Sequence, residues 1–313
     1  MLGRTASGLY WMFRQLERSE NTARLLEAGM RMALTRAASS ENEWASIVMT
    51  AGNQAGYQAK HDGYDADRVA DFLLRDRDNP SCVMCLFEAA RNNARMVRTA
   101  LTREVWENVN EGWLALKEQL AKPIPASELP DILNLIRQRG ALVRGSWAGT
   151  ALRNDIYNFA RLGTRIERAD NTARILDVKY YVLLPSTSQV GSSLDNVQWE
   201  SVLRSASAAR SFNWLYGGEA TPMKIAEYLI LNRQMPRSLR YSCEGYVEAL
   251  DNLSEGYGEV MPSAKMAREA LDELTVTEIE AIFRQGLHEF LTGFIARNNA
   301  IGMQIEADYR FNA

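Results

Sequence analysis

Histidine and cysteine are scarce in this sequence, and their scarcity limits the chemistry that it supports. The 313 residues include two histidines and three cysteines. Three cysteines cannot form a fully paired disulfide framework, so we expect a reducing compartment. A di-metal carboxylate bundle needs Glu-x-x-His pairs on facing helices, and neither histidine is preceded by glutamate at that spacing. We therefore expect no metal site and no cofactor held by the chain itself.

Long apolar segments and a strong net charge are also missing. No uncharged apolar run approaches the ~20 residues that span a bilayer. Residues 1–7, Met-Leu-Gly-Arg-Thr-Ala-Ser, contain no apolar signal segment, so we expect a cytoplasmic protein. The net charge of −3 predicts no general attraction to nucleic acid or to an anionic membrane.

Known nucleotide and acyl-transfer motifs are absent, and lysine is rare. The sequence contains no glycine-rich phosphate loop, no Gly-x-Ser-x-Gly and no kinase-like set, so it gives no support for self-sufficient nucleotide or acyl chemistry. Six of the 36 basic residues are lysine and the rest are arginine. Arginine suits fixed bidentate pairing with carboxylate or phosphate, although a high GC content of the coding DNA would give the same excess.

The most informative feature present is a polar decapeptide that occurs twice. Residues 17–26 read Glu-Arg-Ser-Glu-Asn-Thr-Ala-Arg-Leu-Leu, and residues 167–176 read Glu-Arg-Ala-Asp-Asn-Thr-Ala-Arg-Ile-Leu. The two copies are 150 residues apart, close to half of the chain. A match of this kind indicates an internal duplication.

Weaker matches extend the duplication beyond the motif. Trp44 corresponds to Trp199, residues 70–74 correspond to 226–230, and Arg77 with Pro80 corresponds to Arg233 with Pro236 at a constant offset of 156. The sequence therefore predicts two halves, 1–150 and 151–313, related by a pseudo-twofold axis and packed as one globular unit.

Apolar residues recur every three to four positions throughout, and no strand-like alternation is present. We therefore predict an all-α bundle of about a dozen helices. The first motif lies in a helix predicted over residues 7–37 that is apolar on two sides, which indicates a helix packed between others. We also predict that Asn79 caps a helix beginning at Pro80, and that the last helix runs over 277–309.

Several motifs resemble the alpha-E domain family, a bacterial all-helical family. They are Leu-Gly-Arg-Thr-Ala-Ser-Gly-Leu-Tyr-Trp at 2–11, both decapeptides, Arg-Asp-Asn-Pro-Ser at 77–81, Arg233 with Pro-Arg-Ser at 236–238, and Gly-Leu-His-Glu-Phe-Leu at 286–291. The resemblance implies a companion of circularly permuted ATP-grasp ligases and transglutaminase-like cysteine peptidases, in peptide synthesis or modification. Asn92 departs from the family pattern, which has Glu in the Arg-Glu-Asn-Ala-Arg run.

The two motif copies form the first candidate site. Glu17 and Glu167 are candidate acid/base groups. The candidate ligand-binding residues in the motifs are Arg18, Glu20, Asn21, Arg24, Arg168, Asp170, Asn171 and Arg174. The alternative is a buried lattice of Glu and Arg that locks two central helices together, since ion-pair networks often fix register.

Arg77, Arg91, Arg95 and Arg98 form a second candidate site, an anion-binding face beside the predicted helix start at Pro80, where free backbone N–H groups favour negative ligands. The alternative is a solvated helix flank paired with Asp76, Asp78 and Glu88. In the second half, Val247 and Asp251 stand where Arg91 and Arg95 would map, so only one half carries this charge.

These observations leave three functional hypotheses. The leading one is an accessory, non-catalytic helical subunit that docks an ATP-grasp-type peptide ligase, which would supply the ATP chemistry, and presents a carboxylate-bearing peptide through its arginine face. A transglutaminase-like peptidase is a second expected partner. The alternatives are a peptide-modifying enzyme that uses the central Glu/Arg cluster, and a purely structural oligomeric scaffold.

Overall fold

The structure is a computed structural model that describes residues 1, 3–33, 41–183, 193–217 and 220–311. Within these residues it contains fifteen α-helices, one short 3-10 helix and no strand. The predicted all-α class is confirmed, with somewhat more helices than the expected dozen.

The first half of the chain supplies α1 (Gly3–Ala33), α2 (Glu41–Ala51), α3 (Gln54–Gln58), α4 (Ala66–Leu74), α5 (Val83–Met96), η1 (Arg98–Ala100), α6 (Arg103–Gln119) and α7 (Leu129–Thr150). The second half supplies α8 (Asp155–Leu183), α9 (Ser193–Ser205), α10 (Ala209–Tyr216), α11 (Pro222–Ile230), α12 (Leu239–Tyr257), α13 (Pro262–Val276), α14 (Ile279–Gln285) and α15 (Leu287–Asp308).

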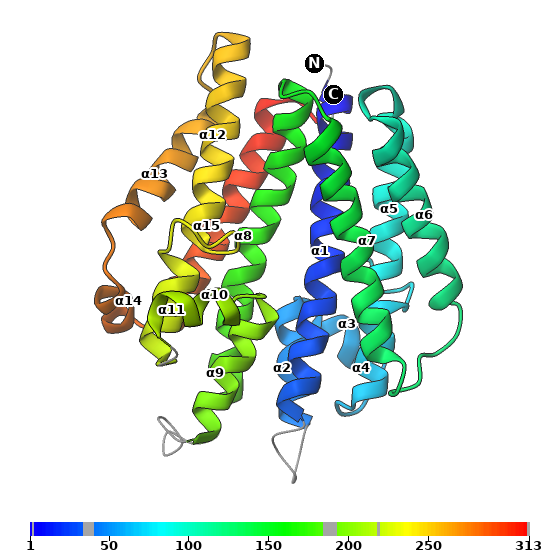
Figure 1. Cartoon of the computed structure of the whole chain (residues 1–313), viewed down its shortest axis with the longest axis vertical. Coiled ribbons are helices and arrows are strands. Elements are labelled where there is room, and N and C mark those ends of the chain that lie inside the picture. Colours follow the sequence, from blue (N-terminus) through cyan, green and yellow to red (C-terminus); the bar gives the residue numbers. More distant parts are fainter. Residues whose placement is uncertain (2, 34–40, 184–192, 218–219, 312–313) are drawn as a thin grey trace.

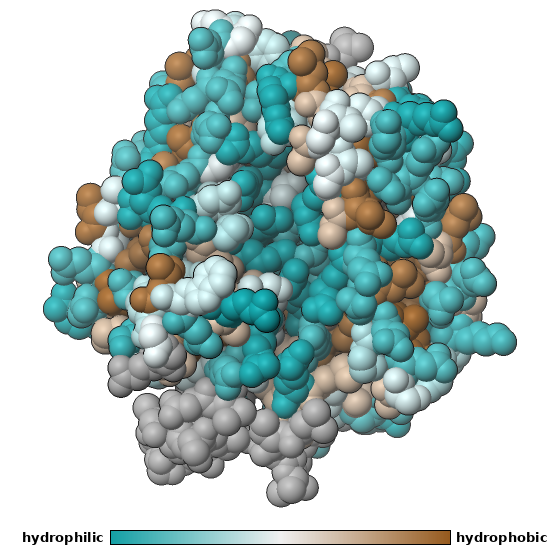
Figure 2. Space-filling view, in the orientation of Figure 1, coloured by the Kyte–Doolittle hydropathy of each residue, from teal (hydrophilic) through white to brown (hydrophobic). Residues whose placement is uncertain are grey.

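Two long helices, α1 and α8, lie side by side through the middle of the molecule and carry the two decapeptides (Figure 1). Helices α5 and α7 pack against α1, and α12 and α15 pack against α8. Most of α1 is buried, including residues on opposite sides such as Leu9 and Leu25. The prediction of a helix packed between others is therefore confirmed. Hydrophilic side chains gather along the middle of one face of the molecule, over α7 and α8 (Figure 2).

The two central helices touch at a glycine. A Cβ atom at Gly163 of α8 would lie 2.1 Å from the backbone oxygen of Tyr10 on α1. No side chain fits in that space, so the backbones approach closely only because this residue is glycine. The contact lies one helical turn before the second decapeptide and brings the motifs within reach of each other.

Three local predictions were wrong in detail. Helix α1 begins at Gly3, before the predicted Ser7, because its first turn packs against the chain end: a Cβ at Gly3 would meet the backbone oxygen of Arg310 at 2.1 Å. The last helix is divided at Gly286, whose φ of 108° interrupts the helical backbone between α14 and α15. The predicted end of the first helix at residue 37 lies outside the described residues.

The third error concerns the start of α5. This helix begins at Val83, and Cys82 is its N-cap, with Sγ accepting a hydrogen bond from the backbone N–H of Cys85 at 3.3 Å. Asn79 instead closes the preceding turn: its amide donates to the backbone oxygen of Phe72 at 3.0 Å and accepts from the N–H of Ser81 at 3.0 Å. The turn signal was correct, but the helix starts three residues later.

The division into halves, 1–150 and 151–313, stays a prediction. In its favour, α1 has α5 and α7 as neighbours, and α8 has α12 and α15, which hold the corresponding places in the chain. Helix α7, the last element of the first half, packs against α1 and α6.

Candidate functional site: the paired motifs of α1 and α8

Each motif binds the glutamate of the other through its arginine. Arg168 on α8 donates from Nε to Oε1 of Glu17 and from Nη2 to Oε2, both at 2.9 Å. In the reverse direction, Arg18 on α1 donates from Nε to Oε1 of Glu167 at 2.6 Å and from Nη2 to Oε2 at 2.9 Å. Both pairs are bidentate, the geometry that fixes position as well as charge.

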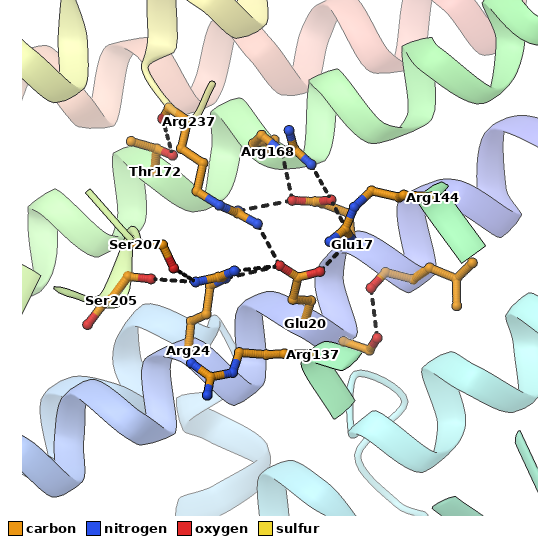
Figure 3. A network of polar contacts seen from close by, with 12 residues as sticks. Glu17, Glu20, Arg24, Arg137, Arg144, Arg168, Thr172, Ser205, Ser207 and Arg237 are labelled. Carbon is orange, nitrogen blue, oxygen red and sulfur yellow. Dashed lines mark hydrogen bonds and ion pairs between the residues drawn. The ribbon is translucent and has the colours of Figure 1, made fainter. Parts of the chain in front are cut away.

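Glu17 and Glu20 share a larger group of arginines, here called the Glu17–Glu20 network (Figure 3). Both glutamates are 1% exposed. Arg237 donates to Glu17 at 3.1 Å and to Glu20 at 2.6 Å. Arg24 donates to Glu20 at 2.7 Å, and Arg144 forms ion pairs with both glutamates. The arginines of this network come from α1, α7, α8 and the segment before α12, so four parts of the chain meet at two carboxylates.

Hydrogen bonds to the backbone hold two of these arginines in place. Thr172 of the second motif donates from Oγ1 to the backbone oxygen of Arg237 at 2.7 Å. Arg24 also donates from Nη1 to the backbone oxygen of Ser205 at 3.2 Å and to the hydroxyl of Ser207 at 2.6 Å (Figure 3). The network thus fastens the end of α9 and the start of α12 to the central helices.

The arginines keep the buried carboxylates ionised. Burial alone would raise the pKa of Glu17, but the guanidinium groups of Arg168, Arg237 and Arg144 outweigh it and hold the pKa well below its usual range. Burial likewise opposes ionisation of Glu167, and the charges of Arg18 and Arg14 lower its pKa. A carboxylate held in this way retains its charge at neutral pH and is a poor proton acceptor.

Next to the network lies a cavity of about 180 Å³, here called the motif cavity. It is lined by both motifs, by the end of α2 and by the turn before α5: Arg18, Asn21, Thr22, Leu25, Thr50, Ala51, Gly52, Ser81, Glu167, Asp170, Asn171 and Arg174. Asn21 and Asn171 are 3% and 4% exposed. Within the described residues, neither amide atom of Asn21 has a hydrogen-bond partner, and Nδ2 of Asn171 has none.

The sequence profile of the Alpha-E family, described as a predicted alpha-helical domain with a conserved ER motif, matches residues 1–309. The chain belongs to the Alpha-E family. Glu17-Arg18 and Glu167-Arg168 are two Glu-Arg dipeptides of the kind that the description names, and in this chain they form the reciprocal ion pairs.

Relatives among curated proteins are longer than this Alpha-E chain. The uncharacterized protein Mb2597 of Mycobacterium bovis is 24% identical over 318 residues, which cover 94% of this chain and 35% of the relative. The uncharacterized protein Rv2567 of Mycobacterium tuberculosis is 23% identical with the same coverage. The chain therefore spans about a third of the length of these relatives. No solved structure matches it.

The Alpha-E structure divides the predicted motif residues into two groups. Arg18, Asn21, Glu167, Asp170, Asn171 and Arg174 line the motif cavity. Glu17, Glu20, Arg24 and Arg168 belong to the network, and they are not among the residues that line the cavity. The motifs therefore form the buried Glu/Arg lattice and also line a cavity. That the cavity binds a ligand stays a prediction.

The second predicted site, Arg77, Arg91 and Arg95, does not line the motif cavity. Because α5 begins at Val83, Arg77 precedes the helix by six residues, and its backbone oxygen accepts from Sγ of Cys85 in the first turn at 3.9 Å. Arg77 forms an ion pair with Glu88, one of the partners proposed in the alternative interpretation. Asp76 and Asp78, the other two, pair with Lys60 instead, at 2.7 and 2.8 Å.

The remaining arginines of this face follow the flank of α5. Arg91 donates from Nε to Oδ1 of Asn110 on α6 at 2.8 Å, so it connects the two helices. Arg95 is exposed. Arg91 and Arg95 thus lie on α5, which packs against α1 and α6 (Figure 1).

Sequence reasoning missed three arginines that bind motif glutamates. Arg14 donates to Glu167 at 2.9 Å, and Arg144 and Arg237 enter the Glu17–Glu20 network. Arg14 lies one turn before the first motif, a spacing that could have identified it. Arg237 belongs to the Pro-Arg-Ser segment that supported the family resemblance, but nothing local indicates its partner.

The sequence places His288 beside Glu289 as a possible acid/base pair, but it does not indicate the contact of His288 with Asp177. His288 of α15 lies with Nδ1 2.7 Å from Oδ1 of Asp177 on α8, one turn beyond Arg174. Burial raises the pKa of Asp177, although His288 and Arg174 oppose the shift.

No helix in the described ranges is both long and apolar enough to cross a lipid bilayer. The same ranges contain no group of three or more His, Cys, Asp and Glu side chains arranged to hold a metal ion.

Proposed function

We propose that this Alpha-E chain is a non-catalytic binding module that holds a carboxylate-bearing peptide in the motif cavity. The observation that carries the proposal concerns two asparagines that line the cavity: among the described residues, both amide atoms of Asn21 and Nδ2 of Asn171 are buried without a hydrogen-bond partner. A buried polar group without a partner costs about 1–3 kcal/mol, so natural structures retain few of them. A ligand that satisfies these amides would recover that free energy on binding.

The chemistry of the wall suits a peptide. An asparagine side chain offers both donors and an acceptor, so it complements the N–H and C=O of a peptide bond. Arg18 and Arg174 line the same cavity, and their side chains remain 36% and 31% exposed although each is paired with a carboxylate. Guanidinium groups in this position would receive the carboxylate of a peptide through bidentate hydrogen bonds.

The alternative of a peptide-modifying enzyme depends on Glu167. Of the two candidate acid/base groups, Glu167 lines the cavity and Glu17 does not. Arg18 and Arg14 lower the pKa of Glu167 against the effect of burial, whereas a general base works best with a pKa near the operating pH. This geometry favours binding over proton transfer.

Calorimetric titration with short peptides, each with a free and an amidated C-terminus, tests the proposal. We expect free peptides to bind and amidated ones to bind about tenfold or more weakly. Asn21→Ala should abolish binding without destabilising the ligand-free protein, because it removes an unsatisfied buried group. Asn93→Ala on α5 is the matched control: its amide donates to Gln15 at 3.0 Å, so its loss should lower stability slightly and leave binding intact. Equal binding of free and amidated peptides would refute the proposal.

We also propose, from the family resemblance, that the chain is an accessory subunit of an ATP-grasp-type peptide ligase. The greater length of the mycobacterial relatives supports association with further domains. Docking is assigned to the α5 arginines, Arg91 and Arg95. Co-purification with the ligase should be lost in the Arg91→Ala, Arg95→Ala double variant. The control is the Lys265→Ala, Arg268→Ala double variant, which removes two charges from α13 on the opposite edge of the bundle (Figure 1). Equal loss of co-purification in both double variants would contradict docking through α5.

A further inference from the structure

A second cavity, of about 200 Å³, opens between α1, α7 and α8. We call it the arginine pocket and define it by Arg144, Arg161, Arg165, Arg168, Trp147 and Tyr157. None of the described residues that line it is acidic, and it shares no lining residue with the motif cavity.

The carboxylates that balance these arginines lie outside the pocket. Arg144 and Arg168 pair with Glu17 in the buried network. Arg161 donates at 2.6 Å to Glu248 on α12, whose side chain is 61% exposed. Four arginines therefore line the pocket, and the carboxylates that pair with three of them belong to residues that do not line it.

Among the four arginines of the pocket, Arg165 has the least compensation of its positive charge. Its guanidinium carbon lies 4.5 Å from the ring centroid of Tyr241, and within the described residues Nη1 is buried and has no hydrogen-bond partner. Gly245 of α12 makes room for this side chain, because a Cβ there would lie 2.7 Å from Nε of Arg165. Burial, with the nearby charge of Arg168, lowers the pKa of Arg165. A bound anion would stabilise the charged form of Arg165 against both burial and the charge of Arg168.

The ion pairs formed by the motif carboxylates involve more arginines than carboxylates. Among the described residues, seven arginines pair with four carboxylates, a difference of three positive charges: Arg14, Arg18, Arg24, Arg144, Arg168, Arg174 and Arg237 against Glu17, Glu20, Glu167 and Asp170. Uncompensated buried charge is costly. An anion beside Arg144 and Arg168 would reduce that cost.

A neutral donor completes the pocket. Trp147 is 5% exposed, and its Nε1 is buried without a partner among the described residues. Its ring lies parallel to that of Tyr157, with an interplanar angle of 2° and centroids 6.1 Å apart. Two residues of the lining, Arg165 and Trp147, thus each carry a buried nitrogen donor without a partner among the described residues. The other lining residues are Phe13, Tyr157, Ala148, Ala160 and Thr164, besides the remaining arginines.

We infer that the arginine pocket binds a phosphoryl group, either as inorganic phosphate or as a phosphate monoester. A phosphoryl group carries about −1.5 to −2 charges and three strong acceptor oxygens, enough to accept from several guanidinium groups and the indole N–H together. A single carboxylate brings one charge and two oxygens, and it would leave part of the donor set unsatisfied. This site is independent of the peptide proposed for the motif cavity.

Titration of the full chain with phosphate, followed by calorimetry and 31P NMR, tests the inference. We expect saturable binding of inorganic phosphate that chloride and acetate do not displace at equal ionic strength. Arg165→Gln should weaken it about tenfold or more, the effect of losing one charge-assisted hydrogen bond. The same variant should leave the stability of the ligand-free protein unchanged or higher, because no carboxylate loses its partner. Arg268→Gln on α13 is the matched control and should bind phosphate as the wild type does.

Two further arms keep the test decisive. Trp147→Phe removes the indole N–H and keeps an aromatic ring, so it should weaken phosphate binding even if Arg165→Gln fails to fold. Asn21→Ala should bind phosphate normally, which separates this site from the motif cavity. Tighter binding of phenyl phosphate than of phosphate would identify an aromatic ester as the ligand, and equal binding would identify the free phosphoryl group. Unchanged phosphate affinity in Trp147→Phe and in a folded Arg165→Gln would overturn the inference.

Discussion

Glu17 of α1 and Arg168 of α8, 151 residues apart, form a bidentate ion pair with both N–O distances at 2.9 Å. Arg18 and Glu167 form the same contact in the opposite direction. Because each guanidinium must meet both oxygens of its partner, a shift of one helix along the other would break all four hydrogen bonds. The two pairs therefore fix the register of the two helices around which the bundle is packed.

Replacing Glu17 by glutamine should destabilise the protein severely. Arg168, Arg237 and Arg144 would lose a shared anion in a buried site, and breaking a buried pair by removing one partner costs about 3–5 kcal/mol. The free energy of unfolding from urea denaturation measures the loss. Asp251→Asn is the matched control, because its pair with Arg268 is 41% and 48% exposed and such pairs contribute little. Similar stability of the two variants would contradict a structural role for the network.

The two members of a reciprocal pair should be energetically coupled. Once Glu17→Gln has been made, Arg168→Gln removes a cation that already lacks part of its partner, so the double variant should lose less than the sum of the single losses. Residues in one ion-pair network show interaction energies of about 0.5–3 kcal/mol. A double-mutant cycle on unfolding free energies measures this term, and a cycle between Glu17 and Asp251 should give a value near zero. Additive losses for Glu17 and Arg168 would show that their contact contributes nothing specific.

Acid should unfold the protein through the motif carboxylates. The arginines depress the folded-state pKa of Glu17 and Glu167 against the effect of burial, so the unfolded chain binds protons first as the pH falls. Stability due to these groups is complete above the unfolded glutamate pKa of about 4.3 and is lost below it, toward the folded pKa. Asp177 and Glu306 act in the opposite sense, because burial raises the pKa of each.

Urea titrations between neutral pH and about pH 3 test the acid dependence. The wild type should lose stability steeply below about pH 4.5, and Glu167→Gln, less stable at pH 7, should show a shallower decline because one linked group is gone. Parallel curves for the two proteins would mean that Glu167 has the same pKa in the folded and unfolded chains.

The sequence was sufficient to predict the centre of the molecule. A polar decapeptide of both charge signs in an apolar helix cannot stay unpaired when buried, and its second copy at residue 167 supplied the partners. The family resemblance covered the same positions. The sequence did not predict partners from segments that lack a repeated motif. Arg144 from α7 and Arg237 from the turn before α12 reach Glu20 only through the packing of distant elements.

Local signals failed where tertiary contacts decide the outcome. Asn79 and Pro80 are good helix-start residues, yet Asn79 is used to close the turn after α4, and the helix begins after Cys82. The cavity amides were predicted as ligand groups from their place in the motif. Asn21 lines a cavity, whereas its neighbour Glu20 belongs to the network. This difference depends on which helices pack on each side of α1, and a single sequence does not specify that packing.

Gly163→Ala should separate the two central helices. The added methyl group would lie 2.1 Å from the backbone oxygen of Tyr10, and backbone cannot move aside as a flexible side chain can. Overpacking of this kind costs about 1–3 kcal/mol, and the displaced helices would also strain both reciprocal ion pairs. Gly145→Ala on α7 is the matched control, since nothing lies within 4 Å of its Cβ position and a helical Gly→Ala change should stabilise by about 0.5–1 kcal/mol. Opposite signs for the two variants in thermal unfolding would confirm that the close contact at Gly163 holds the motifs in register; stabilisation by both would mean that α1 and α8 can part without cost.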